Sequence, residues 1–357
     1  MRKISLVLFA LILSRAVFPQ GINLPSFYSQ RELRAPLAVK NQLALIRKDI
    51  AAKNLKYQVG YTSVAEVPLE KITGFRPPSP DLERRLKEKP KPKPDLSIIA
   101  GNVTEVITDV KVLGEMPWPG NPYVFGNPSQ SRLDLRQAGF VTPVRDQGLW
   151  GSCWAFSAMA AYESSYKILT KKDINTSEEY VVNCSGAGDW GGGWMVLVFK
   201  WMTDNQKNVA DETALPYTGP PMACPSGSPE ANYYAAEWGQ VDPTKPLNIV
   251  PSVSLMKEAI CRYGAISTAL SVTESFKLYV GGVFYQAGSV SGQLNHGVAI
   301  IGWDDSIQCW LIKNSWGTGW GSECGYGTDR GYMWIKYDSS NIGCHAIWIR
   351  ASTIIHN

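Results

Sequence analysis

The stretch Gln147-Gly-Leu-Trp-Gly-Ser-Cys153-Trp-Ala-Phe156 decides how this chain folds and what chemistry it can carry. The residues after Cys153 are mostly small or apolar, which favours a buried helix that begins at the cysteine. Unpaired backbone N–H groups and the dipole at a helix N-terminus lower the pKa of a cysteine placed there. An arbitrary cysteine is more often a buried structural residue. With an amide donor, Gln147, shortly upstream, Cys153 is instead predicted to be a nucleophile.

A thiol nucleophile needs a base, and the chain offers only three histidines. His356 stands next to the last residue of the sequence, where fraying is expected, and a packing role is the better interpretation of His345. His296 opens an apolar run that is typical of a buried strand, and Gly297 beside it leaves room for a close approach. We therefore expect His296 to be the base.

The third candidate is Asn314, in the stretch Ile312-Lys-Asn-Ser-Trp-Gly-Thr-Gly-Trp-Gly321. Its side chain can accept a hydrogen bond from the far ring N–H of His296, which fixes the tautomer and leaves the other nitrogen facing Cys153. Trp316 is predicted to lie over this hydrogen bond and to strengthen it by excluding water. Together the residues predict a Cys-His-Asn site for nucleophilic catalysis.

Three motifs, QGLWGSCWAF, LNHGVAIIGW and IKNSWGTGWG, occur here in the order typical of papain-like cysteine peptidases. The chain resembles this family from about Leu133 to Ile349, and Cys153 and His296 are separated by about 130–150 residues, as in the family's signature. The resemblance implies an α+β fold with two lobes. One is a helical lobe whose central helix starts at the nucleophile, and the other is an antiparallel, β-barrel-like lobe.

The same resemblance implies a role for each candidate. Cys153 is the nucleophile that forms an acyl-thioester, His296 is the general base and later acid, and Asn314 orients the histidine. Gln147 gives its side-chain amide to the oxyanion hole, with the backbone N–H of Cys153 as second donor. Each such donor typically contributes about 3–4 kcal/mol when removed singly. No cofactor is implied, and no spacing of cysteines and histidines resembles a zinc or other metal site.

The resemblance also predicts where a peptide binds. Gly192 and Gly193 match glycines whose backbone pairs with an extended substrate, because glycine has no Cβ to obstruct the approach. The pocket for the second residue before the scissile bond (P2) is predicted to be lined by the apolar residues Met195, Ile349 and Ala269. We therefore expect apolar or aromatic P2 side chains and poor use of arginine. The expected substrate-binding residues are Gly192, Gly193, Trp194, Met195, Ile349 and Trp316.

Two tryptophans stand where the family usually has a disulfide near the active site, Trp150 and Trp190. If the lobes keep their usual arrangement, the two indoles meet where that disulfide would be. A stacked aromatic pair contributes about 0.5–1.5 kcal/mol beyond its area burial, against about 2–4 kcal/mol for a typical disulfide. The alternative is two unrelated surface tryptophans.

The chain has seven cysteines, and Cys153 is reserved as a thiol. By the resemblance, Cys184 and Cys224 form a disulfide. Four further cysteines allow three pairings, among which the spacing does not choose: Cys261, Cys309, Cys324 and Cys344. The family's usual partner for Cys344 is missing, so Cys324, which lies in an insertion, is the expected substitute. Cys261 falls in a helical pattern and is compatible with a buried free thiol.

The N-terminus has the pattern of a secretory signal peptide. Arg2 and Lys3 precede an apolar run, Ile4–Leu13, that is too short to span a bilayer, and small residues suit cleavage after Ala16. Residues 1–16 are therefore predicted to be a signal peptide. We expect a protein that is secreted or delivered to another extracytoplasmic, lysosome-like compartment, without stable membrane association.

Residues 17–75 are predicted to be an inhibitory propeptide. Residues 31–50 have apolar positions spaced as on one face of a helix, residues 57–64 are extended in pattern, and residues 68–72 suit a short helix. This resembles the short propeptides of the family, in which an extended segment crosses the cleft backwards. An N-terminal accessory domain is the alternative.

Residues 76–130 are predicted to be a Pro/Lys-rich linker with the remainder of the pro-region, and residues 131–357 the peptidase domain. The linker's first part, 76–94, holds six prolines and seven basic residues, so it cannot bury a core and should be extended. Its charge equals the +4 of the whole chain. No aromatic residues interleave with these basic residues, which argues against a nucleic-acid partner.

Two other functions are weighed against hydrolysis. A catalytically silent homologue would use the cleft only to hold peptides, and the intact catalytic set speaks against it. An acyl-transferring ligase shares the acyl-enzyme, and the sequence does not separate it from a hydrolase. We expect a secreted endopeptidase made as an inactive proenzyme, acting as a monomer on peptide or protein substrates, with its own propeptide in the cleft.

Overall fold

The computed structural model describes residues 24–77, 126–204, 207–219, 223–226, 233–286 and 294–352. The predicted signal peptide (1–16) and most of the predicted linker (76–130) lie outside these residues. No helix in the described ranges is both long enough and apolar enough to cross a membrane.

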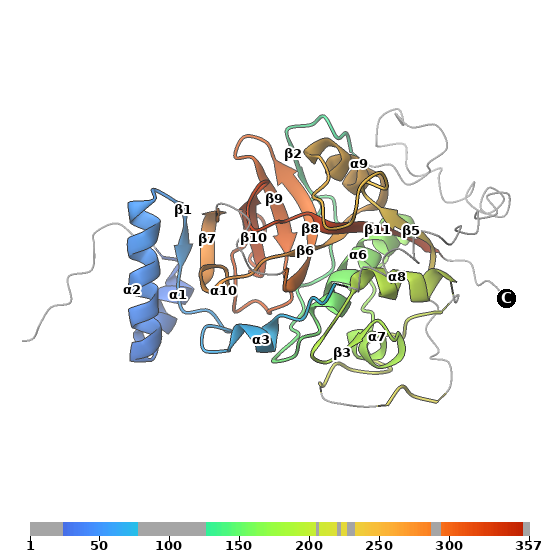
Figure 1. Cartoon of the computed structure of the whole chain (residues 1–357), viewed down its shortest axis with the longest axis horizontal. Coiled ribbons are helices and arrows are strands. Elements are labelled where there is room, and N and C mark those ends of the chain that lie inside the picture. Colours follow the sequence, from blue (N-terminus) through green and yellow to red (C-terminus); the bar gives the residue numbers. More distant parts are fainter. Residues whose placement is uncertain are drawn as a thin grey trace, which may run out of the picture.

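The helical lobe is built around α6 (Cys153–Thr170), with α7 (Glu178–Cys184) and α8 (Met195–Asp204) beside it (Figure 1). Most of α6 is buried, because small residues such as Ala155, Ala158 and Ala161 let neighbouring elements approach its axis closely. The side chain of Ser177 caps α7 by accepting the Tyr180 N–H at 2.9 Å. As predicted, the central helix starts at Cys153.

The other lobe is a sheet of nine strands within the described residues, in the order β1-β7-β10-β9-β8-β6-β11-β5, with β2 paired to β8. All pairs are antiparallel except β7 with β10, which are parallel. The α+β, two-lobed prediction is therefore confirmed, with this one parallel pair as the exception. The strands are β1 (Lys56–Val59), β2 (Arg132–Asp134), β5 (Tyr234–Gln240), β6 (Ile266–Leu270), β7 (Tyr279–Phe284), β8 (His296–Asp304), β9 (Cys309–Lys313), β10 (Tyr332–Lys336) and β11 (Cys344–Ser352).

The central helix joins the two lobes. It packs against β6, β8 and β11, and α9 (Val253–Tyr263) packs against the same three strands. Strand β8 is consequently buried from His296 to Trp303, which explains its continuous apolar sequence. This packing sets the first residue of β8 beside the first residue of α6. A short helix, α10 (Glu274–Lys277), precedes β7, and two short strands, β3 (Gly188–Asp189) and β4 (Gly192–Gly193), pair with each other before α8.

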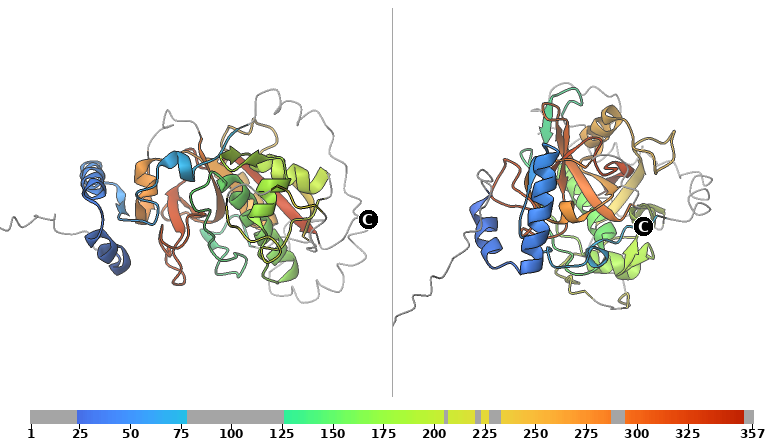
Figure 2. Two further views of the ribbon diagram at one scale, coloured as in Figure 1. Left: turned by 90° about the horizontal axis from the view of Figure 1, so that it is seen from below. Right: turned by 60° about the vertical axis from the view of Figure 1, so that its left-hand side comes forward.

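Residues 24–77 form α1 (Ser26–Leu33), α2 (Leu37–Ala52), β1 and α3 (Leu69–Ile72). Helices α1 and α2 lie at the end of the molecule opposite α7 and α8, and α3 leads back toward α6 (Figures 1 and 2). Strand β1 pairs antiparallel with β7, so this segment extends the sheet of the folded domain.

The helix expected over residues 31–50 is instead two helices. Pro36, the N-cap of α2, separates them, because proline disfavours the helical region for Ala35 before it and has no N–H with which to continue the first helix. The apolar spacing is nevertheless used as expected, since Val39 and Leu43 are the buried residues of α2.

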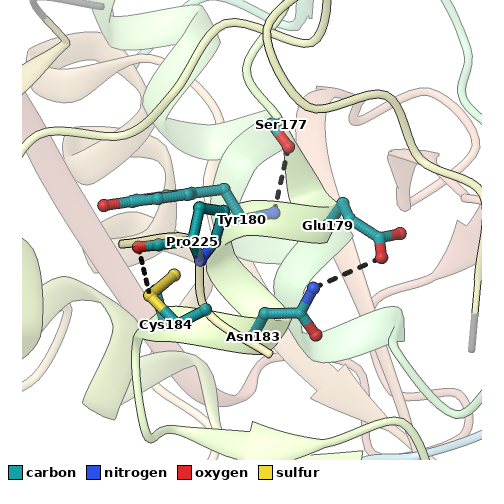
Figure 3. Close-up of a disulfide and its surroundings, with 7 residues drawn as sticks. Ser177, Glu179, Tyr180, Asn183, Cys184 and Pro225 are labelled. Atoms are coloured by element: carbon teal, nitrogen blue, oxygen red, sulfur yellow. Dashed lines mark hydrogen bonds between the residues drawn. A yellow bond between two sulfur atoms is a disulfide. The ribbon is translucent and has the colours of Figure 1, made fainter. Parts of the chain in front are cut away.

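The predicted disulfide between Cys184 and Cys224 is present, at the end of α7 (Figure 3). The predicted bond between Cys324 and Cys344 is wrong, because both are buried free thiols, as are Cys261 and Cys309. The segment carrying Cys324 pairs with β10, whereas Cys344 opens β11, and the sheet order places β9, β8 and β6 between them. Neighbouring strands are about 4.8 Å apart, and a disulfide needs Cα atoms within about 7 Å.

Candidate active site

Three candidate catalytic residues come from three different elements. Cys153 is the first residue of α6, His296 is the first of β8, and Asn314 directly follows β9. Because β8 and β9 are antiparallel, the start of β8 lies beside the end of β9. The structure therefore brings Asn314 to the histidine ring, where its Oδ1 lies 2.8 Å from His296 Nε2. This hydrogen bond holds the imidazole with Nε2 as the protonated nitrogen.

The indole of Trp316 covers this hydrogen bond. Its ring centroid lies 4.8 Å from that of His296, at an interplanar angle of 38°, and the tryptophan is fully buried. Excluding water from the pair strengthens it. Trp316 therefore lies where the sequence predicted it would lie.

The sulfur of Cys153 accepts the backbone N–H of Gly297 at 3.4 Å. A Cβ at position 297 would lie only 3.2 Å from the Cys153 carbonyl oxygen, so glycine permits this close approach between α6 and β8. Nε2 of His296 is engaged by Asn314, whereas Nδ1 is buried without a hydrogen-bond partner in the described part of the chain. Nδ1 is the ring nitrogen left for proton exchange.

Gln147 is fully buried and held at both ends of its amide. Its Oε1 accepts the Ser315 hydroxyl at 2.7 Å, and its Nε2 donates to the Trp150 carbonyl at 2.6 Å and to the Ile72 carbonyl at 3.2 Å. The indole N–H of Trp316 donates to the same Ile72 oxygen, also at 3.2 Å. Two side-chain N–H donors thus converge on one main-chain carbonyl, which is the arrangement an oxyanion would use.

A supporting residue that the sequence did not reveal is Tyr217. Its hydroxyl lies 2.6 Å from the Ser152 hydroxyl and donates to the Gln147 carbonyl at 3.0 Å. It therefore ties the loop that carries Gln147 to the residue immediately before Cys153. No motif marks Tyr217, because its segment is distant in sequence from both groups that it bonds.

The predicted tryptophan pair forms. The rings of Trp150 and Trp190 are 5.9 Å apart at 76°, an edge-to-face contact rather than the stacked one expected, and Tyr217 packs against Trp190 at 5.6 Å. An aromatic cluster thus occupies the place where the family's usual disulfide would lie.

Residues 72–76 cross the site as an extended peptide. Gly193 pairs with this segment through two backbone hydrogen bonds, accepting from Arg76 N at 2.9 Å and donating to Gly74 O at 2.8 Å. Phe75 also donates its N–H to the Asn295 carbonyl at 2.9 Å, and its bridge to Gly193 is parallel. The glycine predicted to pair with substrate therefore pairs with a segment of the same chain.

The side chain of Phe75 is almost fully buried. It is buried in the same cluster as Met195, Ala269 and Ile349, the residues predicted to form the P2 pocket. The ring of His345, which the sequence predicted to be a packing residue, lies 4.9 Å from the Phe75 ring. His345 Nδ1 accepts the indole N–H of the neighbouring Trp194 at 3.3 Å, so one more predicted substrate-binding residue belongs to this pocket wall.

Burial sets the protonation of the covered site. It raises the pKa of the Cys153 thiol to about 11, although backbone N–H groups, first that of Gly297, oppose the shift. It lowers the pKa of His296 to about 4, against the hydrogen bond with Asn314. Both groups are therefore neutral at pH 7. The expectation that the helix N-terminus lowers the thiol pKa is wrong for this covered state, because desolvation outweighs the N–H groups.

The model of the papain family cysteine protease matches residues 129–347. Cathepsin K of Gallus gallus is 34% identical over 230 residues, which span 62% of this chain and 66% of that protein. Procathepsin L of Mus musculus is 33% identical over 219 residues, spanning 58% and 61%. The matches thus span just under two thirds of these relatives' own length.

A solved structure shares the fold. The digestive procathepsin L2 proteinase from Tenebrio molitor larval midgut superposes with a TM-score of 0.64 at 23% identity, over 91% of this chain and 92% of that one. The family match covers more than half of this chain and includes Cys153, His296 and Asn314. The chain belongs to the papain family of cysteine proteases.

Proposed function

We propose that this chain is the proenzyme of a secreted cysteine endopeptidase. The observation that carries the proposal is the extended peptide at residues 72–76, which lies on Gly193 directly over the Cys153–His296–Asn314 constellation. A peptide is thus already seated where a substrate would bind, and the carbonyl of Ile72 accepts a hydrogen bond from the Gln147 side chain, one of the two donors predicted for the oxyanion. Export through a signal peptide at residues 1–16 and maturation within residues 76–130 stay predictions.

In the proposed reaction His296 acts as an acid in the first half-reaction and as a base in the second. In the open site the proton of Cys153 lies on His296, so the thiolate Sγ attacks the scissile carbonyl carbon, and the oxyanion accepts hydrogen bonds from Gln147 and the Cys153 backbone N–H. The C–N bond then breaks, His296 gives its proton to the leaving amine, and an acyl-thioester remains. Water, deprotonated by His296, attacks the thioester. The C–S bond breaks, the acid leaves, and the thiolate is restored beside the protonated His296.

Residues 72–76 would inhibit in two ways. Their parallel pairing with Gly193 orients the chain opposite to the substrate direction that the family resemblance implies, so no scissile carbonyl is presented correctly. Their burial of Cys153 keeps the thiol protonated. Release of the segment would reverse both effects at once.

Within residues 72–76, which cover the site, Gly74 makes the closest approach to the rest of the chain. A Cβ at position 74 would lie 1.8 Å from the Gly151 carbonyl oxygen, which is backbone and cannot rotate away. Gly74→Ala should therefore displace residues 72–76 and raise the reactivity of Cys153 in the uncleaved chain by about tenfold or more, since each 1.4 kcal/mol of lost docking free energy is tenfold. The measurement is the rate of Cys153 alkylation in uncleaved molecules.

Gly281→Ala is the matched control. Gly281 lies on β7 opposite Gln58 of β1, and a Cβ there would meet only the Gln58 side chain at an ordinary 3.7 Å. This variant should behave as the wild type. Equal alkylation rates for Gly74→Ala and the wild type would show that Gly74 does not hold the cover in place.

The P2 pocket provides the test of the proposed function. With Phe75 removed, the matured enzyme should hydrolyse substrates with phenylalanine or leucine at P2 at least about tenfold faster than those with arginine, because Met195, Ala269 and Ile349 offer a buried charge no partner. Cys153→Ser should abolish hydrolysis of all three substrates. If the wild type leaves every substrate intact, the protein is a peptide-binding homologue; if arginine equals leucine, the pocket assignment is wrong.

A further inference from the structure

The side chain of Arg76 lies on a surface that the catalytic mechanism does not use. Its Nη1 lies 3.3 and 3.4 Å from the two carboxylate oxygens of Asp189. Among the ion pairs of the described residues, this is the one that Asp189 makes. Asp189 belongs to β3, next to the Gly193 that pairs with residues 74–76.

Two glycines form the floor under the arginine. A Cβ at Gly192 would lie 2.6 Å from Arg76 Nε and 2.8 Å from its Cδ, and a Cβ at Gly191 would lie 2.8 Å from Nη2. The arginine side chain therefore lies flat against bare backbone along its length. A side chain at either position would lift it away from the carboxylate.

The carboxylate itself is held in place. Asp189 Oδ1 accepts the Gly191 backbone N–H at 2.7 Å, and the Asp189 carbonyl accepts the indole N–H of Trp154 at 3.3 Å. These bonds fix the aspartate to α6 and to the glycine floor. The acceptor is thus oriented by its own loop and does not depend on Arg76 for its position.

The register identifies the subsite. Gly74 reaches the nucleophile, and Phe75 is buried in the same apolar cluster as the residues assigned to P2. Arg76 is the next residue away from Cys153, on the same run of backbone pairing. A substrate running in the opposite direction would place its third residue before the scissile bond (P3) where Arg76 lies now.

We propose that Asp189, Gly191 and Gly192 form a P3 subsite that selects a guanidinium side chain. Together with the P2 pocket, it favours peptides that carry arginine followed by an aromatic or large apolar residue before the cleaved bond. The inference rests on the proposed peptidase function, and Arg76 stands in for the substrate arginine. Asp189 loses this partner when the N-terminal segment leaves, so the subsite opens on maturation.

The expected strength of the P3 preference depends on how exposed the ion pair is to solvent. The side chains of Arg76 and Asp189 are 59% and 67% exposed, and ion pairs between exposed groups are weak and screened by salt. We expect kcat/KM to be about two- to fivefold higher for P3 arginine than for a neutral residue of the same shape. The difference should shrink as ionic strength rises.

The experiment compares substrates that differ only at P3. The matured enzyme is given peptides with P2 phenylalanine and with arginine, citrulline or glutamate at P3, citrulline being the neutral analogue of arginine. We expect kcat/KM to be highest with arginine at P3, lower with citrulline and lowest with glutamate. Asp189→Asn, which can still accept the Gly191 N–H, should make arginine and citrulline equal while hydrolysis of the citrulline peptide is retained. Gly191→Ala should also remove the preference for arginine.

Asp173→Asn is the control variant, because Asp173 is an exposed aspartate beyond the far end of α6, paired with Lys167. It should leave the arginine preference unchanged. Equal kcat/KM for the arginine and citrulline peptides in the wild type would overturn the inference. So would a decrease of kcat/KM in Asp189→Asn that is the same for all three peptides. Failure of the wild type to cleave any peptide would instead overturn the proposed function.

Discussion

Cys153 should be alkylated at least about a thousandfold more slowly in the uncleaved chain than after the N-terminal segment has been removed. In the covered site the thiol pKa is about 11, so roughly one thiol in ten thousand is ionised at pH 7. A thiol paired with an imidazolium at a helix N-terminus instead has a pKa of about 3.5–7.5 and is largely thiolate at that pH. Alkylation requires the thiolate, so its rate follows this population.

Intact-mass analysis of a partly matured sample measures both rates at once. Cleaved and uncleaved molecules differ in mass, so the iodoacetamide adduct is counted separately in each. The other free thiols, buried and with pKa values raised to about 11–12, should stay unmodified in both forms. Cys153→Ser should remove the fast adduct. Equal rates in cleaved and uncleaved wild-type molecules would contradict the prediction.

The pH dependence of Cys153 alkylation distinguishes this mechanism from one in which the site takes up a proton when it opens. At pH 7 Cys153 and His296 of the covered site share one exchangeable proton besides the one fixed on Nε2, and it lies on the sulfur because the His296 pKa is about 4. The open site also carries one, on the imidazole of an ion pair. Uncovering the site relocates a proton without binding one. Above the pKa of the open thiol, the contrast in alkylation should therefore fall about tenfold with each unit of pH and vanish near pH 11, where the covered thiol ionises.

Much of this site could be predicted from the sequence because its groups stand at element boundaries. Small residues mark α6 from Cys153 onward, and a continuous apolar run marks β8 from His296 onward, so each candidate sits where a buried element begins. Asn314 stands at the opposite kind of boundary, directly after the last residue of the buried strand β9. The side chain of a boundary residue can reach into a cleft while its neighbours fix its position.

Residues outside such patterns could not be predicted. Tyr217 and Asp189 act through hydrogen bonds to segments distant in sequence, and only the folded structure brings those segments together. The failed pairing of Cys324 with Cys344 has the same cause, since strand order decides which cysteines meet. The depressed thiol pKa expected from the helix N-terminus was overridden by the cover, whose depth of burial no local motif encodes.

Gln147→Ala should lower kcat of the matured enzyme by about 10²–10³-fold, the usual loss on removing one oxyanion donor. Its Nε2 already donates to a main-chain carbonyl of the covering segment, that of Ile72, and Ser315 holds the amide in this orientation. Because the donor acts on charge that develops only in the transition state, KM should change little. The measurement is steady-state hydrolysis of the best P2 substrate.

Two comparisons distinguish a lost oxyanion donor from a damaged fold. Gln137→Ala, at an exposed glutamine in the loop after β2, should keep wild-type kcat. In Gln147→Ala itself, Cys153 should still be alkylated at nearly the wild-type rate, because alkylation forms no oxyanion and depends on the thiolate and His296. If alkylation falls as far as kcat, Gln147 positions the nucleophile instead of binding the oxyanion. If kcat is unchanged, the backbone N–H of Cys153 and the Trp316 indole suffice without it.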